Sequence, residues 1–112
     1  DLKIVPWIDD APKNVKTMTL NKLRTKVKKK KLWAIHELGT RYKYGYRGVE
    51  ESLDKAIDNY KKGVKLGSPR SMVCLGYMYE HGEGVAKNAK LAFKYYQMGA
   101  FKGFESALKC TV

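Results

Sequence analysis

Residues 75–103 read LGYMYEHGEGVAKNAKLAFKYYQMGAFKG, and the stretch upstream of them carries the same pattern. Residues 38–67 read LGTRYKYGYRGVEESLDKAIDNYKKGVKLG, which aligns at an offset of 37 residues, or 36 after one extra loop residue in the first copy. The matching pairs are Leu38 and Leu75, Gly39 and Gly76, Tyr42 and Tyr79, Gly45 and Gly82, Gly48 and Gly84, Ala56 and Ala92, and Tyr60 and Tyr96. A fixed period of this length is the signature of a repeat architecture.

Each copy is predicted to form two helices joined by a glycine-rich turn. In the second helix of the first copy, apolar residues recur every three or four positions, which is typical of one apolar helix face; they are Leu53, Ala56, Ile57, Tyr60 and Val64. Ser52 and Asn88 precede the second helices as N-caps, and Ser68, followed by a proline, predicts the start of the next first helix. Gly39 and Gly76 lie inside helices, where glycine costs about 1 kcal/mol against alanine. They therefore predict a close approach of two helices.

The fold class that follows is all-α, an α/α-hairpin solenoid with five to six helices and no sheet. The expected segments are an N-terminal extended segment over 1–14, a capping helix over 15–31, repeat 1 over 32–67, repeat 2 over 68–103 and the start of a truncated repeat 3 over 104–112. The cap is expected because the end of a repeat stack would otherwise expose its apolar face to water.

At the other end, repeat 3 stops before its first helix is complete. The outward face of repeat 2 is therefore expected to be partly uncovered, and it carries Phe93, Phe101, Phe104 and Leu108. Because burying apolar area contributes about 25 cal/mol per Å², this face predicts either a longer parent chain or end-to-end association with a second copy or a partner.

The pattern Leu-Gly-x-x-Tyr, Gly-x-Gly-Val, Lys-Ala-x-x-x-Tyr and a closing glycine resembles the Sel-one-like repeat, a relative of the tetratricopeptide repeat. The resemblance covers a little over half of the chain, with Leu91 where the family usually has lysine and Asn88 where it has aspartate. It implies hairpins stacked into a tetratricopeptide-like superhelix whose groove binds other proteins, with no catalysis and no cofactor. Val5-Pro6-Trp7-Ile8 also resembles the last knuckle of a zinc module, but both cysteines are absent and no metal is assigned.

A protein or peptide partner is therefore expected to lie across the helix-lined concave surface. The candidate partner-binding residues on the first helices are His36, Arg41, Lys43 and Tyr77, because they fall outside the packing positions. Trp7, Tyr44 and Tyr46 also lie outside the repeated positions and are expected to be exposed contacts.

The chain of 112 residues carries a formal net charge of +12, and its charge is densest in the basic patch Lys26, Lys28, Lys29, Lys30 and Lys31. Such a run is typical of a solvated helix end, where cations interact favourably with the helix dipole. It also leaves a basic nucleic-acid-binding domain as the alternative function. Against it, Glu37, Asp54, Asp58, Glu80 and Glu83 are expected to interrupt a continuous cationic face.

The sequence lacks the arrangements that catalysis or a metal site needs. Two cysteines and two histidines are scattered without metal-ligand spacing, and Cys74 and His81 lie about 10 Å apart on one helix, beyond hydrogen-bond reach. Cys74 and Cys110 occupy equivalent positions in successive units, so both are expected to be free thiols. Reduced cysteines favour a cytoplasmic or nuclear location, and no apolar run is long enough to span a membrane.

Overall fold

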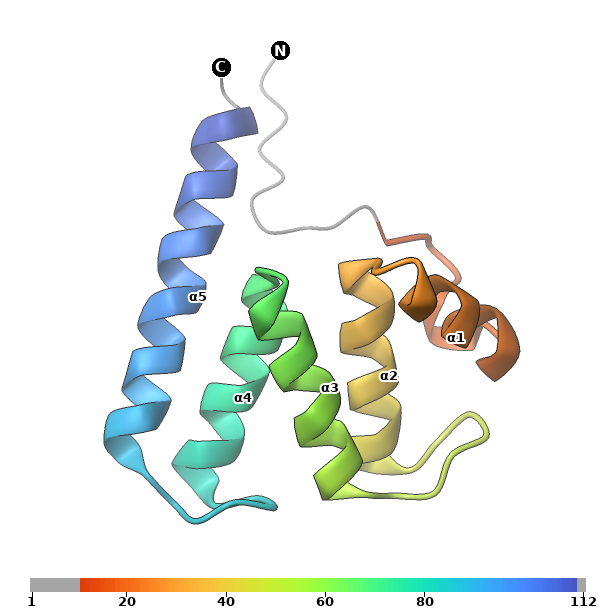
Figure 1. The fold of residues 1–112 in the computed structure, drawn as a ribbon, viewed down its shortest axis with the longest axis horizontal. Coiled ribbons are helices and arrows are strands. Elements are labelled where there is room, and N and C mark those ends of the chain that lie inside the picture. Colours follow the sequence, from red (N-terminus) through yellow and green to blue (C-terminus); the bar gives the residue numbers. More distant parts are fainter. Residues whose placement is uncertain (1–10, 111–112) are drawn as a thin grey trace.

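The computed structural model describes the backbone of residues 11–110 and the side chains of residues 11–103. Its elements are η1 (Val15–Thr17), α1 (Leu20–Lys28), α2 (Leu32–Tyr44), α3 (Leu53–Lys65), α4 (Pro69–His81) and α5 (Ala89–Cys110). Within this part of the chain there is no strand. Each helix packs mainly against the next one along the chain, so α2–α3 and α4–α5 form two successive hairpins (Figure 1). The predicted all-α hairpin solenoid is confirmed.

Side-chain caps set where the helices begin, as the sequence predicted. Ser52 Oγ accepts a hydrogen bond from the backbone N–H of Lys55 at 3.3 Å. Ser68 Oγ accepts one from the N–H of Ser71 at 3.3 Å, and Asn88 Oδ1 accepts one from the N–H of Leu91. Each bond satisfies a backbone donor that has no partner within its helix.

The repeated glycines inside the first helices allow the two helices of each hairpin to approach closely. A Cβ added at Gly39 would lie 2.8 Å from the ring of Tyr60, and one added at Gly76 would lie 3.0 Å from the ring of Tyr96. The predicted close approach is confirmed in both repeats. In each hairpin the tyrosine ring of the second helix packs against the glycine of the first helix.

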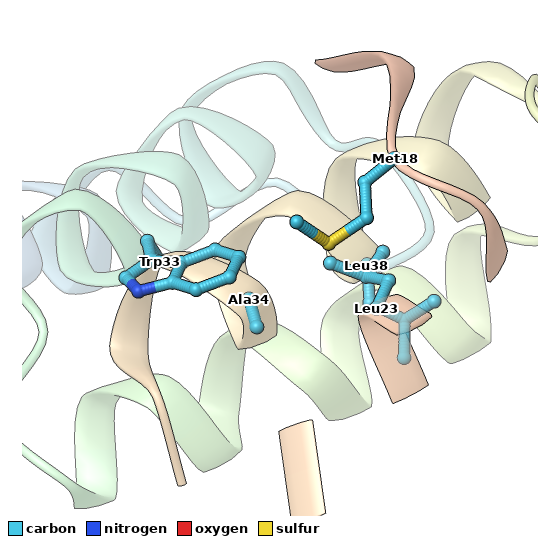
Figure 2. Close-up of a cluster of buried hydrophobic side chains, with 5 residues drawn as sticks. All are labelled: Met18, Leu23, Trp33, Ala34 and Leu38. Atoms are coloured by element: carbon cyan, nitrogen blue, oxygen red, sulfur yellow. The ribbon is translucent and has the colours of Figure 1, made fainter. Parts of the chain in front are cut away.

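Two clusters of buried side chains hold the helices together. The first joins the N-terminal segment to α2 and contains Met18, Leu23, Trp33, Ala34 and Leu38 (Figure 2). The second joins repeat 1 to repeat 2 and contains Ala56, Ile57, Tyr60, Leu75 and Met78. The first cluster is what the capping role requires, because it covers the face of α2 that no preceding repeat covers.

The cap differs in detail from the single helix expected over 15–31. A 3₁₀ turn, η1, comes first, and α1 begins only at Leu20 because the hydroxyl of Thr19 accepts a hydrogen bond from the N–H of Lys22 at 3.3 Å. The chain then turns at Lys30, whose φ of 59° lies in the left-handed region, before α2 starts. Lys26 and Lys28 of the basic patch therefore lie in α1, whereas Lys29, Lys30 and Lys31 lie in the turn that follows it.

The C-terminal end also differs from the expected start of repeat 3. Residues 104–110 continue α5 instead of starting a new helix. In repeat 1, Gly67 adopts a φ of 89° and is followed by the Ser68 cap and a proline, which together end α3 and start α4. Gly103 is followed by phenylalanine and glutamate, so neither the cap nor the proline is present to break the helix.

Candidate protein-interaction surface

The first helices of the two repeats, α2 and α4, share one face of the molecule. His36 Nε2 of α2 lies 3.3 Å from Cys74 Sγ of α4. About two turns further along α2, Lys43 Nζ forms an ion pair of 3.4 Å with Glu83 Oε1, just after α4. These contacts bring together side chains that are 38 and 40 residues apart in sequence. We call this surface the first-helix face, and its members are His36, Lys43, Tyr44, Arg70, Val73, Cys74 and Tyr77.

A cavity of about 270 Å³ opens on the first-helix face and is lined by His36, Arg70, Val73 and Cys74. Burial, together with the positive charges of Arg70 and Lys16, lowers the pKa of His36 to about 4. Burial also raises the pKa of the Cys74 thiol. At neutral pH the pair is therefore an uncharged imidazole beside an un-ionised thiol, so the thiol is not activated as a nucleophile.

The first-helix face also carries exposed side chains with large apolar parts, of which Val73 lines the cavity. Tyr44, Val73 and Tyr77 have 64%, 46% and 43% of their surface exposed. The ammonium group of Lys43 lies 4.4 Å from the ring centroid of Tyr77 and 5.1 Å from that of Tyr44, within the range of a cation–π interaction. The lysine thus holds two exposed rings together at one end of the face.

The structure places three of the four predicted partner-binding residues on this face and excludes the fourth. His36, Lys43 and Tyr77 belong to the first-helix face, whereas Arg41 is fully buried on another side of α2. The prediction for Arg41 is wrong, because its guanidinium is held by Glu37 Oε2 at 3.1 Å and donates to the carbonyl oxygen of Met18 at 2.7 Å. An i,i+4 pair of opposite charges usually lies on a solvated helix face, and the sequence does not show that this pair is covered.

The buried pair has a structural role at the cap. Arg41 also donates to the carbonyl oxygen of Val15 at 3.1 Å, so one guanidinium fastens η1 to α2. The hydroxyl of Tyr46 donates to Glu37 Oε2 at 2.8 Å, and Lys16 Nζ lies 3.5 Å from Glu37 Oε1. Tyr46 is therefore half-buried in this network and does not belong to the exposed contacts that were expected. Burial, together with the hydrogen bond to the Glu37 carboxylate and its negative charge, raises the pKa of Tyr46 to about 12.

Three residues of the first-helix face were missed from the sequence as binding candidates. The sequence suggests only His81, on the same helix, as a histidine near Cys74, whereas the structure places Cys74 beside His36 of the preceding repeat. Val73 occupies the same repeat position as His36, at the offset of 37, and this equivalence was the signal that could have identified it. Nothing in the pattern marked Arg70.

Several other expectations can be compared with the described residues. Cys74 is a free thiol as predicted, whereas the side chain of Cys110 and the stretch 4–8 with its zinc-module resemblance lie outside the described part. Within residues 11–103, no cluster of three or more histidine, cysteine or acidic side chains is placed to hold a metal ion. None of the described helices combines the length and the apolar character needed to cross a bilayer.

Comparison with known proteins identifies both hairpins. The Sel1 repeat family profile matches residues 34–68 and 69–103. The chain is 39% identical over 59 residues to the ERAD-associated E3 ubiquitin-protein ligase component HRD3B of Arabidopsis thaliana, which covers 53% of this chain and 10% of that protein. The chain thus spans about a tenth of this curated relative.

Solved structures with the same fold include two bacterial repeat proteins. A Sel1 repeat protein from Oxalobacter formigenes is 32% identical with a TM-score of 0.69, over 74% of this chain and 63% of that one. The protective antigen c5321 of uropathogenic Escherichia coli, which displays an SLR fold, is 30% identical with a TM-score of 0.73, over 80% of this chain and 19% of that one.

Proposed function

The chain belongs to the Sel1 repeat family, and we propose that it acts as a protein-interaction module whose partner lies across the first-helix face. Repeats of this family serve in adaptors and regulators that bind other proteins. The observation that supports this particular surface is that the exposed side chains of Tyr44 and Tyr77, which meet at Lys43, share a face with a cavity that the exposed Val73 lines. Exposed aromatic residues beside a small pocket are the usual anchors of a protein interface.

The chemistry of the cavity indicates what kind of group it would accept. At neutral pH His36 and Cys74 are uncharged, and Arg70 supplies a cation at the rim. A volume of about 270 Å³ accommodates one side chain of a partner. We expect a partner side chain with an apolar body and a hydrogen-bonding or acidic tip.

We propose further that the chain is not itself a catalyst, since its family is generally a non-catalytic interaction module. The matches give no support to the nucleic-acid alternative. A reducing compartment, the cytoplasm or the nucleus, fits the free thiol of Cys74.

The experiment is affinity capture from an extract of the source cells, with a basic protein of equal net charge as the control bait. Tyr44→Ala combined with Tyr77→Ala should abolish capture of the partner, while the fold persists because both rings are exposed. Lys22→Ala combined with Lys61→Ala is the control, because both side chains are exposed and lie outside the first-helix face and the outward face of repeat 2. Equal capture by the double variant and by the wild type would show that the partner binds elsewhere.

A further inference from the structure

Lysines from two distant parts of the sequence meet at one edge of the molecule, where α1 and α3 both end (Figure 1). Lys26 and Lys28 lie in the last turn of α1, and Lys62 and Lys65 lie in the last turn of α3. Lys30, in the turn between α1 and α2, lines two neighbouring cavities, one with Lys26 and the other with Lys28, Lys62 and Lys65. We call these five lysines the basic edge.

Among the described residues, no acid pairs with a lysine of the basic edge. Neither of its two cavities has a described aspartate or glutamate in its lining. Glu37, which was expected to interrupt a cationic face, is buried against Arg41 instead. Asp58 lies one turn before Lys62 on α3 and is the nearest acid along that helix.

The other acids that were expected to interrupt a cationic face lie away from this edge. Asp54 is in the first turn of α3, at the opposite end of that helix from Lys62 and Lys65. Glu80 and Glu83 lie at the end of α4 and in the loop after it. Of the five acids expected to interrupt a cationic face, Asp58 alone lies within one turn of a lysine of this edge, and the clustered positive charge raises the local affinity for anions.

Apolar side chains form the floor between the lysines. The smaller cavity, of about 360 Å³, contains Val27, Ile35 and Leu66, and Leu66 keeps 39% of its surface exposed. The larger cavity, of about 590 Å³, includes Met18 and Trp33. Trp33 is only 7% exposed, so it offers no ring face on which a nucleic-acid base could stack.

The backbone at the centre of the edge is also unusual. Lys30 has a φ of 59°, in the left-handed region where glycine or asparagine is favoured. A lysine there is less stable than a glycine would be, and it is the residue that lines both cavities. Its conformation ends α1 as a helix C-cap, because the N–H of Lys31 donates to the carbonyl oxygen of Lys26 at 3.1 Å and the N–H of Lys30 donates to that of Val27 at 2.9 Å.

We propose that the basic edge binds an acidic peptide segment of a partner protein, with its carboxylates on the lysines and an aliphatic side chain in the cavity of Val27, Ile35 and Leu66. The charge of the edge selects acidic residues, and the apolar floor selects a peptide over a phosphate backbone. The surface is separate from the first-helix face, so this binding does not depend on that face being the main interface.

The test measures fluorescence anisotropy of a labelled 12-residue synthetic peptide of Asp-Glu pairs separated by leucines, titrated with the full chain. We expect saturable binding that weakens as salt rises. Replacing each leucine by serine should weaken binding several-fold, and a 12-nucleotide oligodeoxythymidylate should bind more weakly than the leucine peptide. Equal affinity for the serine peptide or tighter binding of the oligonucleotide would overturn the proposal.

Paired variants locate the site. Lys62→Glu with Lys65→Glu should weaken peptide binding about tenfold or more, since each exposed charge contact contributes up to about 1 kcal/mol and reversal adds repulsion. Lys90→Glu with Lys94→Glu, exposed on α5, makes the same change in net charge and should leave the affinity nearly unchanged. An equal loss in both pairs would show attraction to net charge alone and refute a site at the basic edge.

A second variant tests the site in a chain that is expected to stay folded. Lys30→Gly removes a charge shared by both cavities and relieves the left-handed backbone, so its thermal midpoint should be equal to or above that of the wild type while peptide affinity falls. Unchanged affinity in this folded variant would contradict the proposal.

Discussion

The two repeats place different residues at the same positions of their first helices. Glu37 and Arg41 of α2 correspond to Cys74 and Met78 of α4 at the offset of 37. The first pair forms a buried ion pair that faces the N-terminal cap, whereas Met78 lies in the apolar cluster between the repeats. Each first helix therefore has side chains suited to the element that covers it. Arg41 of α2 donates to backbone carbonyl oxygens of the cap, whereas Met78 of α4 packs in the apolar cluster with side chains of α3.

The second helices differ in the opposite sense, because they have similar residues and different neighbours. Ile57 of α3 corresponds to Phe93 of α5 at the offset of 36. Ile57 is 5% exposed under α4, whereas Phe93 is 62% exposed because no described helix follows α5. Phe101 is also exposed, while the side chains of Phe104 and Leu108 lie outside the described residues. A longer array or end-to-end association remains a prediction for this face.

The largest effect is expected at the buried ion pair. Glu37→Ala leaves the guanidinium of Arg41 buried without its carboxylate, which should lower the free energy of unfolding by about 3–5 kcal/mol. Cys74→Ala, at the equivalent position of repeat 2, should cost far less. Urea unfolding followed by circular dichroism measures both values. Glu37→Cys combined with Arg41→Met installs the residues of repeat 2, and it should lose less than Glu37→Ala does; a greater loss would contradict the interpretation.

The next effect compares the covered and uncovered second helices. Ile57→Ala should lower the free energy of unfolding by about 2–4 kcal/mol, because it removes buried methyl groups and leaves a cavity. Phe93→Ala should change it by about 0.5 kcal/mol or less, as is usual for an exposed position. The two chemical denaturation curves provide the measurement. Similar losses for both variants would mean that a second copy or the end of the chain covers Phe93 in solution.

A smaller difference is expected at two equivalent glycines. A Cβ at Gly63 would collide with the Cβ and hydroxyl of the buried Ser71, so Gly63→Ala should cost about 1–3 kcal/mol. At Gly99 the nearest atom is a methyl of the half-exposed Val73 at 3.0 Å, which can give way. There the helix-propensity gain of about 1 kcal/mol offsets the crowding, and Gly99→Ala should be near neutral. The thermal midpoint of each variant is measured against that of the wild type. Equal shifts for Gly63→Ala and Gly99→Ala would show that the two glycines do not differ in packing.

The smallest effect is a pH dependence of the free energy of unfolding that comes from His36 in repeat 1. The equivalent position of repeat 2 holds Val73, which does not titrate. The pKa of His36 is about 4 in the folded chain and about 6.5 in the unfolded chain. The unfolded chain therefore binds a proton first, and stability falls as pH drops through this window. Between pH 7 and pH 5.5 we expect a loss of about 1 kcal/mol, measured by urea unfolding at each pH.

Charged groups near His36 affect its pKa, so the control variants should leave those groups unchanged. Arg70 and Lys16 lower its pKa and Glu37 raises it, so changes at those positions would alter the pH profile as well. His36→Gln should abolish most of the pH dependence, whereas His81→Gln, at an exposed position, should not. A steep pH dependence that persists in His36→Gln would assign it to other groups.

Much of the candidate site was predictable because it depends on repeat position. His36, Lys43 and Tyr77 fall outside the packing positions, and all three reach the first-helix face. Arg41 falls outside the same positions but is buried, because the cap and not a repeat covers its side of α2. The periodic pattern predicts which side chains one repeat buries against the next. It does not predict which side chains are buried by the N-terminal cap, because the cap is not a repeat.

The sequence by itself determined the two helical hairpins, the residues that cap the starts of their helices, the close approaches at Gly39 and Gly76, and the family. These properties are local or recur with a period, so residues within a few turns of one another decide them. Only the tertiary structure decided that His36 meets Cys74, that Glu37 and Arg41 are buried, and that Lys62 and Lys65 join the lysines of α1. Those contacts join residues that the chain separates or depend on which element covers a helix face, and burial then changes the properties of each charge and thiol.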